Sequence, residues 1–204
     1  TGQPPACFHS CVGRIRYMGP LLYDMDRIPA AANVPDLELV QAQRDVILDP
    51  NDPQVIAEAR KAGIEEPWLE ACRRSPVYKM VKEWRIALPL HSEFRTMPSL
   101  FYVPPESPVR TASNGQGNIR MVGKDDGKQP LPNLDEFRVP IQYLARLLAA
   151  GNESEVKTAL NRLLAMRAYR RSIRVYGQAD LDVLKQVGMT EQQAVEMHRL
   201  LALA

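Results

Sequence analysis

Apolar side chains recur at helical spacing along much of the chain. Residues 76–87 place their apolar side chains on one face of a predicted helix, which comprises Val77, Met80, Val81 and Trp84. Towards the C-terminus a second stripe follows the spacing i, i+4, i+7, i+8 and comprises Val156, Leu160, Leu163 and Leu164. A stripe of this kind requires an apolar partner surface. The pattern therefore predicts amphipathic helices at both places.

Proline and glycine mark where the predicted helices begin and end. Asn51 or Asp52 can accept the free N–H groups of a first helical turn, and Pro53 suits the first helical position. Gly63 suits the position just past the end of that helix. The same punctuation predicts further helices over residues 67–74 and 76–87, and one that begins near Asp36.

Short extended segments are predicted at two places. Residues 13–24 mix β-branched and aromatic side chains around Gly19 and Pro20, which predicts two short strands with a turn between them. Residues 96–105 predict one short strand that ends at two prolines. The predicted fold class is therefore mainly α with a few short strands.

Composition divides the chain into four parts. Residues 106–133 are rich in Gly, Ser, Pro, Asn and Asp and have few apolar side chains, which predicts a flexible excursion. Before it, residues 24–105 form a predicted helical and irregular connecting region with one short strand. After it, residues 134–204 form a predicted all-helical C-terminal domain. Residues 1–23, which contain two cysteines, make up the first part.

The overall composition is that of an ordinary globular protein, with 45% hydrophobic and 25% charged residues among 204. The formal net charge of +2 is too small to indicate a nucleic-acid partner. No run approaches the roughly 18 consecutive apolar residues of a membrane span. The first residues, TGQPPAC, include no Met, basic region or apolar run, so we expect an internal position in a longer protein rather than a signal peptide.

Cysteines carry the candidate metal chemistry. Cys7 and Cys11 are separated by three residues, and the third cysteine, Cys72, lies far downstream. Thiolates suit iron–sulfur clusters or zinc, and the three-residue gap equals that between the last two ligands of a ferredoxin-type site. Such a site needs four ligands, and Val12 stands where small ferredoxins commonly carry proline. From the residues alone, an iron–sulfur cluster, a zinc half-site, a disulfide and two plain thiols all remain open.

The other candidate residues favour structural roles. Cys72 lies in a predicted helix, where a free cysteine behaves as a small buried side chain. His91 and His198 have no ligand-like partner at helical spacing. A basic stripe can meet RNA, anionic lipid or an acidic subunit, or can simply be solvated, and it comprises Arg162, Arg167, Arg170, Arg171 and Arg174. We find no nucleophile–base arrangement, so we do not expect a self-contained active site.

Six segments of the sequence carry a resemblance to a known family. They are CVGRIRYMGPLLYD, LDPNDPQVI, SPVYKMVKEWRIALPLHSEFRTMPSLFYVPP, VPIQYLARLLAAG, ALNRLLAMRAYRR and TEQQAVEMHRLLALA. In order and spacing, these segments resemble the beta subunit of respiratory nitrate reductase. The resemblance extends over essentially the whole chain and is weakest at residues 29–44 and 106–133.

The resemblance implies a fold and a set of ligands. In that family the beta subunit carries ferredoxin-like cluster modules followed by a helical C-terminal region, and this chain resembles the C-terminal part. Residues 1–23 would then be the end of a ferredoxin-like cluster-binding segment. The resemblance implies that Cys7 completes a four-iron cluster with an upstream Cys-x2-Cys pair, whereas Cys11 ligates a second four-iron cluster. Further clusters, including a three-iron cluster, are expected upstream.

The function implied by the resemblance is electron transfer within a membrane-bound nitrate reductase. A membrane b-type cytochrome gamma subunit oxidises quinol, and the beta subunit relays the electrons to a molybdenum-containing catalytic alpha subunit. The expected location is the cytoplasmic face of the cell membrane, with indirect attachment through a partner. No nucleic-acid partner is expected. The helical tail, with its apolar stripe and its arginines, is expected to dock partner subunits.

Two alternatives remain open. Nitrite oxidoreductase and related molybdenum oxidoreductases have a beta subunit of the same plan, and the positions of the ligands do not separate these proteins. The second alternative is a non-catalytic helical interaction domain whose two cysteines bind zinc or remain thiols.

Overall fold

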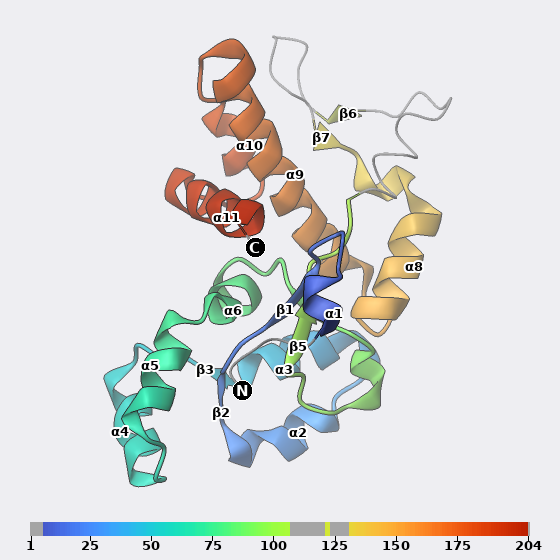
Figure 1. The fold of residues 1–204 in the computed structure, drawn as a ribbon. Coiled ribbons are helices and arrows are strands. Elements are labelled where there is room, and N and C mark those ends of the chain that lie inside the picture. Colours follow the sequence, from blue (N-terminus) through green and yellow to red (C-terminus); the bar gives the residue numbers. More distant parts are fainter. Residues whose placement is uncertain (1–5, 107–120, 123–130, 204) are drawn as a thin grey trace.

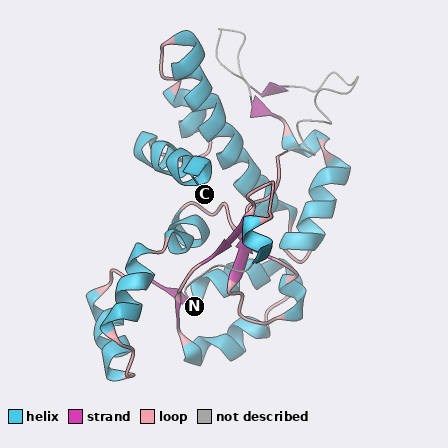
Figure 2. Cartoon of the chain, in the orientation of Figure 1, coloured by secondary structure: helices cyan, strands magenta, loops and turns pink. Residues whose placement is uncertain are grey.

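The computed structural model describes residues 6–106, 121–122 and 131–203, and Figures 1 and 2 show the arrangement of its helices and strands. Helices dominate and the strands are two or three residues long, which confirms the predicted fold class. Most of the predicted flexible excursion at 106–133 lies outside the described residues. Its described part includes β6 (Met121–Val122), which pairs antiparallel with β7 (Leu131–Pro132).

The helices occupy both halves of the chain. In order they are α1 (Ala6–His9), α2 (Ile28–Ala32), α3 (Leu39–Asp45), α4 (Pro53–Lys61), α5 (Glu66–Arg74), α6 (Pro76–Tyr78), α8 (Arg138–Leu148), α9 (Glu153–Tyr176), α10 (Leu181–Lys185) and α11 (Glu191–Leu203). Short 3-10 turns are η1 (Met25–Arg27), η2 (Asp36–Glu38), η4 (Ser92–Phe94) and η5 (Leu134–Glu136), and η3 (Lys79–Glu83) is a π-helical turn. In Figure 1, α9, α10 and α11 lie together at the top, and α4 and α5 lie at the lower left.

The strands form small antiparallel sheets. One sheet has the order β1-β5-β4, with β1 (Arg16–Met18), β5 (Leu100–Tyr102) and β4 (Leu88–Pro89). A second pairs β2 (Leu22–Tyr23) with β3 (Ile47–Leu48). The two extended segments predicted around Gly19 and Pro20 are therefore confirmed as β1 and β2. They do not pair with each other, because each finds its partner in a distant part of the chain.

The predicted helix after residue 52 forms as α4. The side chain of Asp52 accepts a hydrogen bond from the backbone N–H of Gln54 at 2.8 Å, and Pro53 occupies the first helical position. Gly63, just past the end, has a φ of 82°, a conformation that costs glycine little because it has no Cβ. Local capping chemistry thus fixes both ends of this helix.

The helix predicted over 76–87 is shorter than expected. It begins as α6, where the Ser75 hydroxyl accepts from the backbone N–H of Val77 at 3.4 Å, and it continues only through the π-helical turn η3. The chain then turns at Arg85, whose φ is 49°. Arg162 on α9 donates through Nη1 to the carbonyls of Trp84 at 2.8 Å and Glu83 at 3.3 Å. These hydrogen bonds satisfy carbonyls that an ended helix leaves free.

The apolar faces are buried within the chain itself. The predicted face of the 76–87 segment is confirmed, since its four apolar side chains are at most 3% exposed. Along α9, Val156 and Leu160 of the apolar stripe pack in one buried cluster with side chains of α8, whereas Leu163 belongs to a second buried cluster that includes Trp84. The expectation that this stripe docks partner subunits is therefore wrong, because other parts of the same chain already cover it.

Candidate functional site

The candidate metal-binding segment is the short loop that leads into the three-stranded sheet. Cys7 lies exposed on α1, and Cys11 follows it in a half-buried position. The backbone N–H of Cys11 donates to the carbonyl of Phe8 at 3.4 Å, and the N–H of Arg14 donates to the carbonyl of Cys11 at 3.0 Å. Arg14 has a φ of 46°, so the chain reverses here before it enters β1. We refer to residues 7–14 as the cysteine loop.

The surroundings of Cys11 favour its thiolate form. Hydrogen bonding from the backbone N–H of Ile15 is the main cause that lowers the pKa of this thiol, against an opposing contribution from burial. The charge of Arg16 and the backbone N–H groups of Arg14 and Gly13 act in the same direction as Ile15. Because the thiolate is the form that binds metals, this position suits a metal ligand.

Arg16 connects the cysteine loop to the sheet. Its Nη1 donates to the carbonyl of Cys7 at 3.1 Å. Its guanidinium carbon lies 5.9 Å from the centroid of the ring of Tyr102, which is its register partner on β5. The sequence alone gave no reason to select Arg16, because the two groups that it contacts lie on different elements.

The donor set in the described residues is incomplete for a metal cluster. Cys7 and Cys11 are both free, so they do not form the disulfide that their sequence left open. Nowhere in the described ranges do three or more His, Cys, Asp or Glu side chains gather as a possible metal site. The two thiols and the backbone donors around Cys11 fit an iron–sulfur cluster, but only as part of a ligand set completed elsewhere.

The remaining candidates have structural surroundings. Cys72 is 1% exposed in the small apolar cluster of α4 and α5, and burial raises the pKa of its thiol, so its predicted role as a buried side chain is confirmed. His91 pairs through Nδ1 with Glu93 Oε1 at 2.8 Å. On α11, burial lowers the pKa of His198, and arginines of α9 act in the same direction.

The basic stripe on α9 does not act as one surface. Arg162 donates hydrogen bonds to the backbone carbonyls at the end of η3, as described above. Arg167 Nε lies 2.7 Å from Oε1 of the buried carboxylate of Glu106. Arg171 and Arg174 point into solvent. The N-terminal members of the stripe are therefore engaged by contacts within the chain, whereas Arg171 and Arg174 are exposed.

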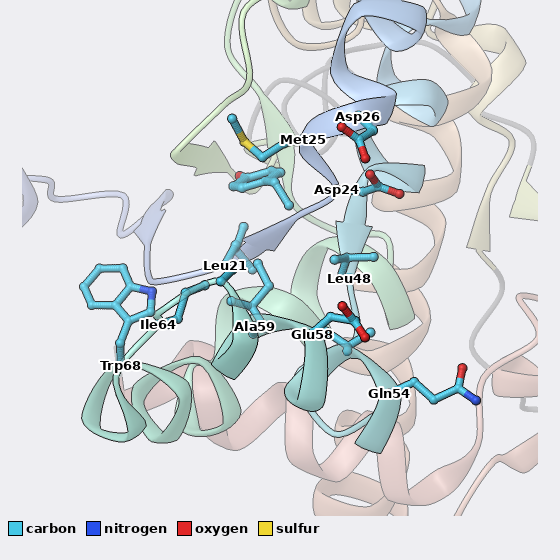
Figure 3. A pocket seen from close by; sticks show the side chains of 14 residues that line it. Leu21, Asp24, Met25, Asp26, Leu48, Gln54, Glu58, Ala59, Ile64 and Trp68 are labelled. Atoms are coloured by element: carbon cyan, nitrogen blue, oxygen red, sulfur yellow. The ribbon is translucent and has the colours of Figure 1, made fainter.

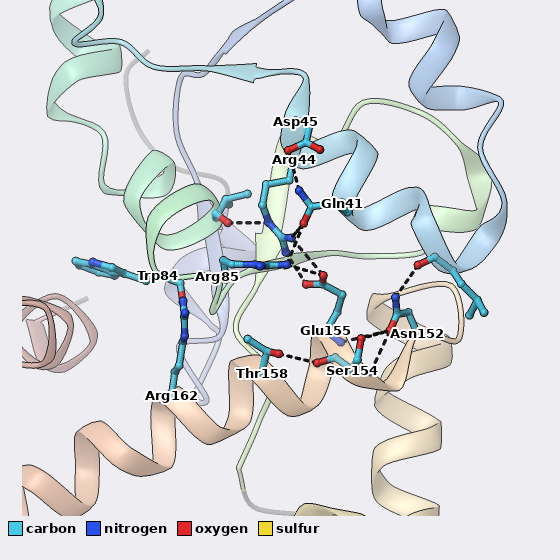
Figure 4. A network of polar contacts seen from close by, with 12 residues as sticks. Gln41, Arg44, Asp45, Trp84, Arg85, Asn152, Ser154, Glu155, Thr158 and Arg162 are labelled. Carbon is cyan, nitrogen blue, oxygen red and sulfur yellow. Dashed lines mark hydrogen bonds and ion pairs between the residues drawn. The ribbon is translucent and has the colours of Figure 1, made fainter. Parts of the chain in front are cut away.

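A buried ionic network joins the two halves of the chain, and the sequence pattern did not reveal it. Glu155, at the start of α9, accepts from Arg44 Nη2 at 2.7 Å and from Arg85 Nη2 at 2.8 Å (Figure 4). Arg44 also donates through Nε to the carbonyl of Val81 at 3.0 Å and through Nη1 to Gln41 at 2.7 Å. The network therefore holds α3, η3 and α9 together.

A cavity of about 710 Å³ lies between β2 and helices α4 and α5 (Figure 3). Its floor is mostly apolar, and Trp68 lies at one side of it. Asp24, Asp26 and Glu58 lie at the opposite side. The cavity lining contains no Cys, Ser, His or Lys that could act with these carboxylates as a nucleophile or base.

Among the described residues, no helix is long and apolar enough to cross a membrane.

Comparison with known proteins identifies the family. Residues 107–191 match the family described as "Respiratory nitrate reductase beta C-terminal". Over its whole length the chain is 50% identical to the respiratory nitrate reductase 1 beta chain of Escherichia coli (strain K12) and 43% identical to the nitrate reductase beta chain of Bacillus subtilis (strain 168). It covers 39% and 41% of the length of these relatives. With the chlorate reductase subunit beta of Ideonella dechloratans, it shares 35% identity over only 48% of its length.

These matches place the chain among the beta chains of multisubunit reductases. Within that class, the chain belongs to the family of respiratory nitrate reductase beta chains. It spans about two fifths of the length of the two nitrate reductase beta chains named above.

Proposed function

We propose that this chain is part of the iron–sulfur electron-transfer subunit of a membrane-bound respiratory nitrate reductase. In this proposal the subunit relays electrons from a quinol-oxidising b-type cytochrome subunit to a molybdenum-containing catalytic subunit. The observation that carries the proposal is 50% identity, over all of this chain, to a nitrate reductase beta chain. The shorter and weaker match to a chlorate reductase subunit makes a related oxidoreductase the less favoured candidate.

Cys7 and Cys11 would each supply one thiolate to a different four-iron cluster, with the remaining ligands outside these 204 residues. An iron–sulfur cluster supplies one-electron transfer when it is bound. The donor set supports this role, because both thiols are free and backbone N–H groups surround the sulfur of Cys11. A three-iron cluster would have its ligands elsewhere in the subunit. A zinc site within the described residues lacks support, since no third ligand lies near the pair.

The rest of the chain would support the cluster ligands and dock the subunit. In the proposed organisation, residues 1–23 end a ferredoxin-like segment, 24–105 connect it to the helices, 106–133 form an excursion and 134–204 form the helical domain. The exposed Arg171 and Arg174 offer a charged face to a partner. Attachment at the cytoplasmic face of the membrane would then be peripheral and would depend on the cytochrome subunit.

No residue of this chain is proposed to act on nitrate. Within the described residues, the polar groups of Arg44, Arg85 and Glu155 form ion pairs that hold helices together, and no Cys, Ser, His or Lys lines the cavity beside Trp68. The chain is therefore proposed as a component of an oxidoreductase and not as an enzyme by itself.

The test is the metal content of the complete subunit that contains this chain, assembled with its partners under anaerobic conditions. Iron, acid-labile sulfide and zinc are measured for the wild type and for Cys7→Ala, Cys11→Ala and Cys72→Ala. We expect each of the first two substitutions to remove iron and sulfide, because each removes a cluster ligand. Cys72→Ala is the matched control and should keep both. Zinc in place of iron, or iron unaffected by the loss of Cys7 and Cys11, would favour the interaction-domain alternative.

A further inference from the structure

The side chain of Arg16 contacts both the cysteine loop and strand β5. It lies at the start of β1, next to the cysteine loop, and is half-buried. One nitrogen donates to the carbonyl of Cys7, and the guanidinium faces the ring of Tyr102 on β5. A cation over an aromatic ring is attracted by the negative face of that ring. A single side chain therefore joins the cysteine loop to the second strand of the sheet.

Arg16 also keeps a donor without an acceptor. Its Nε–H is buried and has no hydrogen-bond partner among the described residues. Buried donors in folded proteins are usually paired, so this Nε–H is free to donate to a group outside the described residues. The sulfur atoms of an iron–sulfur cluster accept hydrogen bonds, and such bonds influence its potential.

The positive charge of Arg16 also lies next to the cysteine loop. Its guanidinium is always protonated, and its Nη1 lies 3.1 Å from the carbonyl oxygen of Cys7. Reduction adds one negative charge to a cluster. A fixed positive charge nearby therefore favours the reduced form.

Resting on the proposed function, we propose that Arg16 is a positioning residue for the iron–sulfur site. It fixes the cysteine loop to β5 through Cys7 and Tyr102, and it holds a positive charge beside the cysteine loop that favours the reduced cluster.

The experiment uses the complete subunit in its assembled complex and measures iron content, the EPR line shape and the midpoint potentials of the four-iron clusters. The variants are Arg16→Gln, which removes the charge, and Arg16→Lys, which keeps the charge but not the planar guanidinium. Arg14→Gln is the matched control, because Arg14 is an exposed arginine of the same loop, whereas Arg16 is half-buried.

We expect Arg16→Gln to lower the reduced-to-oxidised ratio of one four-iron cluster about tenfold at a fixed potential, which corresponds to about 59 mV for one electron. Arg16→Lys should give a smaller shift with an altered line shape, and Arg14→Gln should match the wild type. The inference is overturned if Arg16→Gln leaves potentials and line shape unchanged, or if Arg14→Gln shifts them equally. If Arg16→Gln fails to assemble, an Arg16→Lys complex identical to the wild type overturns the inference. A wild-type complex without iron refutes the proposed function itself, before any variant is compared.

Discussion

Glu155→Gln is expected to destabilise the chain far more than the loss of an equally short ion pair on the surface. Three hydrogen bonds from Arg44 and Arg85 reach the Glu155 carboxylate, and the side chains of Glu155 and Arg44 are 8% and 4% exposed. Removing one member of a buried pair leaves the other charge uncompensated, at a cost of about 3–5 kcal/mol. Since glutamine keeps one acceptor and Arg85 is partly exposed, we expect about 3 kcal/mol, a large part of the stability of a typical domain.

The matched control is Glu58→Gln. Glu58 pairs with Lys61 at 2.6 Å, but both side chains are more than 70% exposed, and such pairs contribute little. Unfolding in urea is followed by the fluorescence of Trp84, which is 2% exposed and adjoins Arg85, in a Trp68→Phe background. Equal urea midpoints for the two variants would refute the argument that burial makes the network important. A Glu155→Leu, Arg44→Met double variant should recover part of the loss, because it removes both buried charges together.

The same prediction has a pH dependence with a definite sign. Burial raises the pKa of Glu155, but hydrogen bonds and charge from Arg44 and Arg85 outweigh it and hold the pKa below its ordinary value of 4.5. A carboxyl group whose pKa falls on folding stabilises the folded state above its unfolded pKa, and this contribution disappears as pH falls through the folded pKa. The difference between wild type and Glu155→Gln should therefore be largest near neutral pH and should narrow below about pH 4.5. A difference that stayed constant down to pH 2 would contradict this assignment.

Three further predictions concern separate parts of the chain. In the metal-free protein near pH 8, iodoacetamide should modify Cys11 much faster than Cys72, because the pKa of Cys11 is lowered and that of Cys72 is raised by burial; equal rates would contradict this. Arg162→Met should cost about 1–2 kcal/mol in urea unfolding, since it leaves two carbonyls at the end of η3 without their donor, and an unchanged midpoint would show that water replaces that donor. Gly19→Ala should cost about 1–3 kcal/mol, because an added Cβ would collide with the hydroxyl that caps α6, and a variant as stable as the wild type would show that the hydroxyl moves freely.

Capping residues and apolar spacing in the sequence correctly predicted the elements that depend on neighbouring residues alone. Asp52 and Pro53 predicted the start of α4, and the spacing of Val77, Met80 and their neighbours predicted a buried face. The early end of the helix predicted over 76–87 was not predictable in this way. Its last carbonyls accept hydrogen bonds from Arg162, which lies on α9, far along the chain.

Long-range pairing was equally hidden from the sequence. Arg44 and Glu155 lie 111 residues apart, and neither stands in a pattern that indicates burial. The apolar stripe of α9 was recognised correctly, but periodicity cannot say whether the covering surface belongs to the same chain. For the candidate site, spacing drew attention to Cys7 and Cys11, whereas their assignment to two clusters came from the resemblance and remains a prediction.

The topology of the first sheet has a consequence for biosynthesis. β1, the strand that follows the cysteine loop, pairs only with β5 within the described sheet, and β5 is translated after helices α2 to α6. A nascent chain that ends before β5 can form the α1 turn but cannot anchor it, because the register partners of β1 do not yet exist. Closing such a long loop is also slow compared with forming local helices. The cysteine loop thus gains its fixed position only after about half of these residues have been made, because its anchoring depends on a strand that is translated after helices α2 to α6.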